Sequence, residues 1–123
     1  MSHITLIETK VKFMNEQILR SALQALGEVG NGIFDHYNKR QDVDMSLYTM
    51  GFPKGIGFKK QGNGEYAVMM DDYGYKTQAH NLLNKISQKY QELAITRAVQ
   101  RQGYHTQAQA GKDGAIKIMA RRY

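Results

Sequence analysis

One long amphipathic helical pattern lies between two glycine-bearing hairpin patterns in the second half of this chain, with no linker between them. The first hairpin pattern covers residues 56–70 around Asn63-Gly64, and the second covers residues 104–120 around Asp113-Gly114. Asn-Gly and Asp-Gly supply the positive-φ positions that tight turns between antiparallel strands need. The chain is therefore constrained to a fold in which paired antiparallel strands pack against a helix.

The helical pattern is expected to begin near Thr77 and to end at Gly103. Its apolar side chains recur at steps of three and four residues, which is typical of a helix with one buried face. We expect these side chains in the core rather than at a cofactor: Leu82, Leu83, Ile86, Tyr90, Leu93, Ala94 and Ala98.

The first half of the chain predicts a strand and a short helix. Ile7 and Phe13 share one parity in a segment that alternates apolar and charged residues, as a half-buried strand does. Asn15 is expected to cap a helix of about three turns, which ends at Gly27 in the left-handed conformation. Residues 28–53 carry weaker signals, and we expect one weak strand and an irregular excursion there.

These elements follow the order β-α-β-β-β-α-β-β and predict a single α+β domain over residues 1–123. Because the strands are segregated from two helices, we expect an antiparallel or mixed sheet with both helices packed on one face, a ferredoxin-like variant. The sequence shows no internal repeat and no low-complexity tract that would divide it further.

Composition excludes several classes of protein. The chain has no Cys, which excludes a disulfide framework, a thiol nucleophile and a thiolate metal site. No stretch approaches the ~18 apolar residues of a membrane span, and the N-terminus lacks the basic and apolar regions of a secretory signal. We therefore expect no membrane span and a location in the cytoplasm, or in the plastid stroma if the gene is organellar.

The residue types that serve catalysis and metal binding are scattered along the chain. No two histidines have the i, i+4 spacing of a helical metal site; they are His3, His36, His80 and His105. The acidic pairs match no loop with defined ligand spacing and are expected to be solvated: Asp42 with Asp44, and Asp71 with Asp72. We therefore expect no catalytic residue, no cofactor and no metal.

The formal charge of +6 favours partners that are acidic or carry phosphate. Basic side chains step along the long helix at multiples of four residues and form a candidate basic row: Lys85, Lys89, Arg97 and Arg101. Further basic residues would extend this candidate surface: Lys59, Lys60, Arg121 and Arg122. The alternative is a solvated helix face, since any amphipathic helix carries Lys and Arg on its wet side.

Tyrosines provide candidates for stacking on unpaired bases: Tyr66, Tyr73, Tyr75 and Tyr104. Tyrosine in strands is also a packing choice, and the aromatic-rich consensus strand of an RNA-recognition sheet is absent from the sequence. RNA binding is therefore the alternative to binding a protein.

A set of short motifs runs through most of the chain in a defined order. They are Met1-Ser2-His3, Ile7-Glu8-Thr9-Lys10, Ala25-Leu26-Gly27, Ile56-Gly57-Phe58-Lys59, Gly64-Glu65-Tyr66, Ile86-Ser87-Gln88-Lys89-Tyr90, Gln102-Gly103-Tyr104, Asp113-Gly114 and Arg121-Arg122-Tyr123. In order and spacing they resemble the Ycf35 family, small proteins of unknown function with a DUF1257-type domain from plastids, cyanobacteria and other bacteria. Residues 31–55 depart from the family pattern. The resemblance implies no catalytic residues.

These observations favour a small non-enzymatic accessory protein that binds a macromolecular partner, namely a protein complex, through the basic helix face or an exposed sheet edge. The alternative is an RNA-binding protein that uses the same basic surface. A homo-oligomer is compatible with either function. The salt dependence of binding distinguishes a protein partner from RNA. Binding to phosphate weakens steeply as salt rises, whereas a largely apolar protein interface is far less sensitive.

Overall fold

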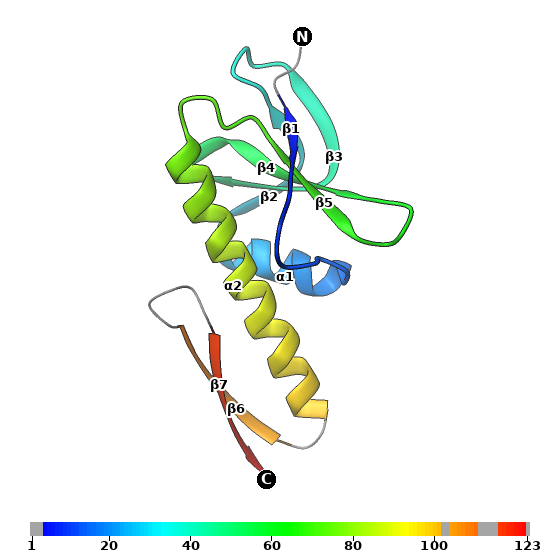
Figure 1. Cartoon of the computed structure of the whole chain (residues 1–123), viewed down its shortest axis with the longest axis vertical. Coiled ribbons are helices and arrows are strands. Elements are labelled where there is room, and N and C mark those ends of the chain that lie inside the picture. Colours follow the sequence, from blue (N-terminus) through cyan, green and yellow to red (C-terminus); the bar gives the residue numbers. More distant parts are fainter. Residues whose placement is uncertain (1–3, 102–103, 111–115, 123) are drawn as a thin grey trace.

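The computed structural model describes residues 4–101, 104–110 and 116–122, the last two ranges as backbone only (Figure 1). The elements in chain order are β1 (Thr5–Ile7), α1 (Glu16–Leu26), β2 (Glu28–Phe34), β3 (Arg40–Thr49), β4 (Phe52–Lys60), β5 (Tyr66–Met70), α2 (Lys76–Arg101), β6 (Tyr104–Ala110) and β7 (Ile116–Arg122). Neither helix of the described chain combines the length and the apolar character that crossing a bilayer requires.

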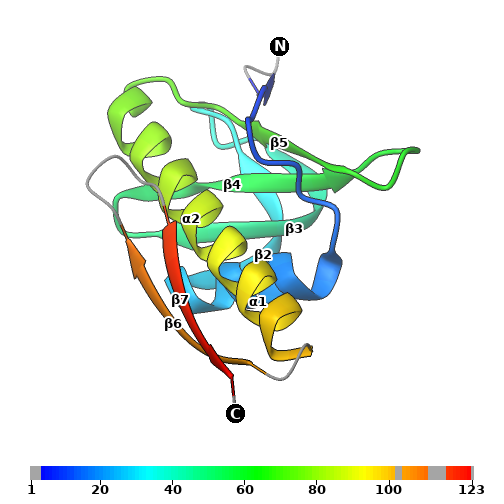
Figure 2. The same cartoon turned by 60° about the horizontal axis from the view of Figure 1, so that its bottom comes forward.

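Five strands form one antiparallel sheet in the order β1-β5-β4-β3-β2, in which β2 to β5 follow one another as a meander. Figure 2 shows α2 crossing one face of this sheet. The α+β class and the antiparallel sheet with two helices are confirmed. The remaining strands, β6 and β7, pair antiparallel in a separate sheet that lies against α2.

Four strands lie between the helices instead of the predicted three, because residues 28–53 form both β2 and β3. The alternation that defines β3 is present in the first part of the strand, where Val43 and Met45 are buried while Asp42 and Asp44 are exposed; beyond it Ser46 and Leu47 are both buried. Such alternation is typical of a half-buried strand. The expected irregular excursion was therefore wrong for this segment.

The hairpin between β4 and β5 closes as its sequence predicts. Lys60 pairs with Tyr66 across the turn, and the Gly64 N–H donates to the Gln61 carbonyl at 3.0 Å. Gly64 has a φ of 86°, in the left-handed region that glycine adopts without steric cost. The Asn63 side chain also accepts from the Glu65 N–H at 3.0 Å.

Helix α1 begins at the predicted cap and ends at the predicted glycine, but the conformation of that glycine differs from the prediction. The Asn15 side chain accepts from the Ile18 N–H at 3.0 Å and caps the helix. Gly27 ends it in an extended conformation, with a φ of 175°, so the predicted left-handed residue was wrong. Glycine is required because a Cβ there would lie 2.6 Å from the Tyr48 carbonyl oxygen, where β3 passes close by.

One core holds both helices against the sheet. Phe13 is fully buried and meets Phe58 and Tyr90 edge-on, at ring-centroid distances of 5.5 and 5.0 Å. The predicted stripe of α2 is buried from Leu82 to Tyr90, but Ala98 is exposed because the last turns of α2 extend beyond the core. The segment after β1 reaches Phe13 without further strand pairing except an isolated bridge to Tyr66.

We predict that Ile86→Ala lowers the free energy of unfolding by about 2–5 kcal/mol, because Ile86 is 0% exposed and its loss leaves a cavity. Ile95→Ala is the matched control on the same helix, since Ile95 is 41% exposed, and should change stability by about 0.5 kcal/mol or less. Chemical denaturation monitored by circular dichroism measures both. Equal effects of the two substitutions would contradict the assigned orientation of α2.

Candidate functional site

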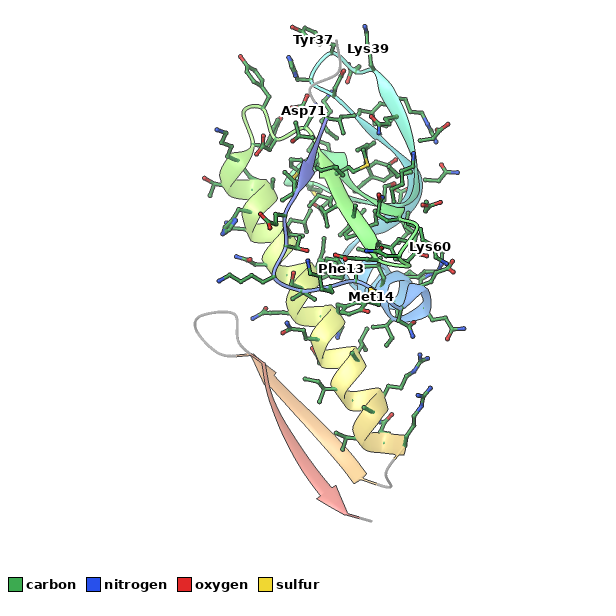
Figure 3. All side chains as sticks on the ribbon, turned by 45° about the vertical axis from the view of Figure 1, so that its right-hand side comes forward. Phe13, Met14, Tyr37, Lys39, Lys60 and Asp71 are labelled. Carbon is green, nitrogen blue, oxygen red and sulfur yellow. The ribbon has the colours of Figure 1, made fainter. Side chains whose placement is uncertain are left out.

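Two connections meet at one end of the molecule, and their side chains form a compact polar and aromatic group (Figure 3). One connection is the β2–β3 turn, residues 35–39, and the other is the β5–α2 connection, residues 71–75. We call His36, Tyr37, Asp71 and Tyr73 the apical cluster. Figure 3 labels Tyr37 and Asp71 at this end of the molecule.

The β2–β3 turn is shaped by the side chain of Asp35. Its Oδ1 accepts from the backbone N–H groups of Tyr37 and Lys39, both at 2.9 Å. Asn38 completes the turn with a φ of 63°, a conformation that Asn tolerates better than most residues. This turn presents His36 and Tyr37 next to each other toward the second connection.

Asp71 joins the two connections. It accepts hydrogen bonds from the His36 N–H at 2.8 Å and from the Tyr73 N–H at 3.0 Å, and its Oδ2 lies 2.7 Å from Nδ1 of the His36 ring. Asp71 is 4% exposed. The sequence-based expectation of a solvated acidic pair was therefore wrong for Asp71, whose three donors come partly from a residue 35 positions away.

These hydrogen bonds determine the charge of the carboxyl group. Burial by itself raises the pKa of Asp71, but the His36 ring and the backbone N–H groups of Tyr73 and His36 outweigh burial and hold the pKa below its ordinary value. An ionised carboxylate can only accept, so Nδ1 of His36 carries a proton toward it. The imidazole ring is thereby held in one orientation.

The His36 ring in turn supports two exposed tyrosines. It stacks on Tyr73 at 4.5 Å with an interplanar angle of 25°, and lies 4.1 Å from the Tyr37 ring at 38°. Tyr37 and Tyr73 remain 63% and 68% exposed. Two large aromatic side chains thus contact an imidazole ring that is held by the buried Asp71 carboxylate.

Lysines lie close to these tyrosines in the two connections. Lys39 and Lys76 are exposed, and Lys54 donates a hydrogen bond to the Asn38 side chain in the β2–β3 turn. Lys76 also lines a groove together with Asp71, Asp72 and Tyr73. The surface around the apical cluster therefore offers aromatic rings and lysine side chains, with the half-buried Asp72 beside them.

A metal ion is a poor fit to this end of the molecule. Within the part of the chain whose side chains are described, no three His, Asp or Glu side chains gather as metal ligands. Asp71 already accepts three hydrogen bonds, so its oxygens are engaged with His36 and Tyr73.

The predicted basic row of α2 spreads around the helix. Sixteen residues separate Lys85 from Arg101, which amounts to a rotation of about 160° beyond whole turns. Lys85 and Arg101 are exposed, Lys89 is 3.5 Å from the Glu92 carboxylate, and Arg97 is half-buried. These four residues therefore do not share one face.

The other predicted basic residues lie elsewhere. Lys59 and Lys60 are exposed at the end of β4, in a hairpin that projects away from α2 (Figures 1 and 2). Arg121 and Arg122 belong to β7, and their side chains lie outside the described part of the structure. The structure thus does not bring Lys60 together with the row on α2.

The predicted stacking tyrosines also separate. Tyr66 is buried, and burial, with Glu16 and Asp44 nearby, raises the pKa of its phenol. Tyr75 is half-buried and meets Phe52 edge-on at 6.0 Å. Tyr73 is exposed, and the side chain of Tyr104 lies outside the described residues. Sequence reasoning missed Tyr37, although its place in a tight turn between strands was a signal for a surface role.

The architecture defines a small α+β protein with a five-stranded antiparallel sheet and two helices. Residues 30–119 match the family described as a protein of unknown function, DUF1257. The chain is 31% identical over 131 residues to the uncharacterized protein ycf35 of Pyropia yezoensis, covering 100% of this chain and 98% of that relative. The chain belongs to this DUF1257, or Ycf35, family. No solved structure matches it significantly.

We predict that Asp71 makes stability depend on acid pH. Because its pKa is lower in the folded than in the unfolded chain, its contribution is fully present above the unfolded value of about 3.9 and is lost as pH falls through the folded value. Asp71→Asn should cost about 1–3 kcal/mol near neutral pH, because buried donors lose their charged acceptor. The difference from the unmodified protein should shrink below about pH 4.

Denaturant unfolding between neutral and acid pH measures this effect. Asp42→Asn is the matched control, since the Asp42 side chain is 88% exposed beside Arg40. A constant difference between Asp71→Asn and the unmodified protein down to the lowest pH would show that the carboxylate is not held ionised.

Proposed function

We propose that this protein is a small non-catalytic accessory protein that binds an acidic surface of a protein partner through the apical cluster. The observation that carries the proposal is the pair of exposed rings in contact with His36: Tyr73 is stacked on the imidazole and Tyr37 is tilted against it. The expectation of a macromolecular partner is retained from the sequence. The proposed contact surface moves from the row on α2 to the end where the two connections meet.

Preorganisation favours binding at this end. A side chain that is already ordered loses little conformational entropy when a partner covers it. Tyrosine is among the residues that dominate the binding energy of protein interfaces, especially at the centre of a contact. His36 and Asp71 order both rings in the free protein. Binding a partner therefore costs little additional conformational entropy of these two side chains.

Charge favours an acidic partner. Lys39 and Lys76 are exposed near the rings, while the Asp71 carboxylate is buried and engaged with His36. The half-buried Asp72 is the acidic residue that shares a groove with Tyr73 and Lys76, so the lysines outnumber the accessible carboxylates there, and the whole chain carries +6. Opposite charge on the partner raises the association rate and selects the orientation of docking.

RNA is the second candidate partner. Exposed tyrosine rings stack on unpaired bases, and nearby lysines neutralise phosphates. Such binding should weaken steeply with salt, whereas a contact centred on two aromatic rings should weaken less. Nuclease sensitivity and salt dependence together separate the two partners.

We predict that Tyr37→Ser with Tyr73→Ser strongly reduces partner capture. Affinity capture from a lysate of the organism that encodes the protein, with nuclease added, should retain acidic proteins on the unmodified chain. The double variant should lose them by about tenfold or more, as expected for central aromatic contacts. Quantitative mass spectrometry measures the loss, and thermal unfolding verifies that the exposed substitutions leave the fold intact.

The control replaces the basic row, Lys85, Lys89, Arg97 and Arg101, with Gln. This variant should keep most of the capture, because its residues point in different directions around α2. Loss of partners by the control but not by the tyrosine variant would reject the apical cluster as the contact surface. Capture that disappears with nuclease would assign the surface to RNA.

A further inference from the structure

The positive charge of this protein is concentrated near the end of its chain. Residues 93–123 contain six Lys and Arg residues and one acidic residue, Asp113, so they hold +5 of the formal charge of +6. Residues 1–92 are close to neutral, with 11 basic and ten acidic residues. A charge excess confined to one part of a chain is typical of a surface that binds a polyanion.

In the fold, this basic segment consists of the last turns of α2 and the antiparallel pair of β6 and β7, which lies against α2. Figures 1 and 2 show both strands beside the second half of α2. Among the described residues, each of the two strands has one strand neighbour, so they form a two-stranded unit, which we call the β6–β7 ribbon. The ribbon lies at the opposite end of the molecule from Tyr37 and Asp71 (Figure 3).

The register of the ribbon sorts its residues onto two faces. Directly paired residues of antiparallel strands share a face, and the faces alternate along each strand. On one face the pairs are Tyr104 with Arg122, Thr106 with Ala120, Ala108 with Ile118, and Ala110 with Ile116. Apart from the first pair, at one end of the ribbon, these residues are small or aliphatic. Since burying apolar residues is favourable and burying charge is costly, we expect this face to pack against α2.

The other face is basic and rich in hydrogen-bonding residues. Its pairs are His105 with Arg121, Gln107 with Met119, and Gln109 with Lys117, and we call these six positions the basic face. Lys117 and Arg121 are four residues apart on β7, which is about 14 Å along a strand. In the major groove of DNA, Arg and Lys pair with the edge of guanine, and Gln pairs with the edge of adenine. The basic face therefore combines positive charge with residue types that recognise base edges.

The shape of the ribbon distinguishes between forms of nucleic acid. The major groove of B-form DNA is about 12 Å wide and admits a two-stranded β-ribbon. The major groove of an RNA duplex is too deep and narrow for side chains to read. Single strands are bound by stacking on aromatic rings, and the described positions of the basic face include no Phe, Tyr or Trp. Duplex DNA therefore fits this face better than either form of RNA.

We propose that the β6–β7 ribbon binds duplex DNA, with its basic face in the major groove. Lys117 and Arg121 supply positive charge at two positions along the groove, and Gln107 and Gln109 supply amide groups for base edges. Arg101 is exposed at the end of α2, just before β6, and adds positive charge next to the ribbon. Strands of seven residues are about 20 Å long, equal to about six base-pair steps.

Fluorescence anisotropy on the full chain tests this proposal, with labelled duplexes of mixed sequence and about 20 base pairs, or two helical turns. At low salt, duplex DNA should bind at least about tenfold more tightly than duplex RNA or single-stranded RNA of the same sequence. The logarithm of the association constant should fall linearly with the logarithm of the salt concentration. Absence of binding at low salt, or equal affinity for either RNA, would overturn the proposal.

Lys117→Gln together with Arg121→Gln should weaken the Kd for duplex DNA by about tenfold or more, because two cationic contacts are lost. Lys59→Gln with Lys60→Gln is the matched control, since it removes two positive charges from exposed residues of the hairpin that projects away from α2. It should change the Kd by about threefold or less, because salt screens distant charges. Equal weakening by the two pairs would show that net charge, rather than the ribbon, holds the DNA.

Dimethyl sulfate footprinting with the unmodified protein locates the contact on the DNA and does not depend on how the variants fold. The reagent methylates N7 of guanine, an atom that lies in the major groove. A ribbon seated in that groove should reduce guanine methylation in the bound duplex. Tight binding without protection of guanine N7 would place the protein on the phosphates or in the minor groove and reject the proposed mode of binding.

Discussion

The contacts of Phe13 hold the separate elements of this fold together. Its ring meets Phe58 of β4 and Tyr90 of α2 edge-on, and its carbonyl accepts from the Tyr66 N–H at 2.8 Å. The Tyr90 hydroxyl then accepts from the N–H groups of Met14 and Asn15, at 3.1 and 3.0 Å, just before α1 begins. One buried aromatic group thereby positions the sheet, both helices and the segment that follows β1.

The apical cluster depends on that arrangement. With α2 fixed across the sheet, its N-terminal end and residues 71–75 come next to the β2–β3 turn, where Asp71 meets His36. A buried carboxylate that orders exposed rings couples the stability of this end of the molecule to the geometry of the surface it presents.

The charge of α2 illustrates why residue spacing alone misjudged a surface. A row at multiples of four residues looks continuous over one step, yet each step turns by about 40°. Over the distance from Lys85 to Arg101 the direction therefore changes by nearly half a turn. Arg97 lies two turns after the buried Tyr90, on the same side of α2 as Tyr90.

The sequence by itself determined the features whose causes act within a few residues: the buried stripe around Ile86, the Asn15 cap and the Asn63-Gly64 turn. Helical periodicity, a capping hydrogen bond and a positive φ are local, so their signals survive without knowledge of the fold. Only the tertiary structure decided that Asp71 is buried and that Tyr37 and Tyr73 stand together. Their partners are distant in the chain, and such contacts exist only once the strand order has brought the two connections side by side.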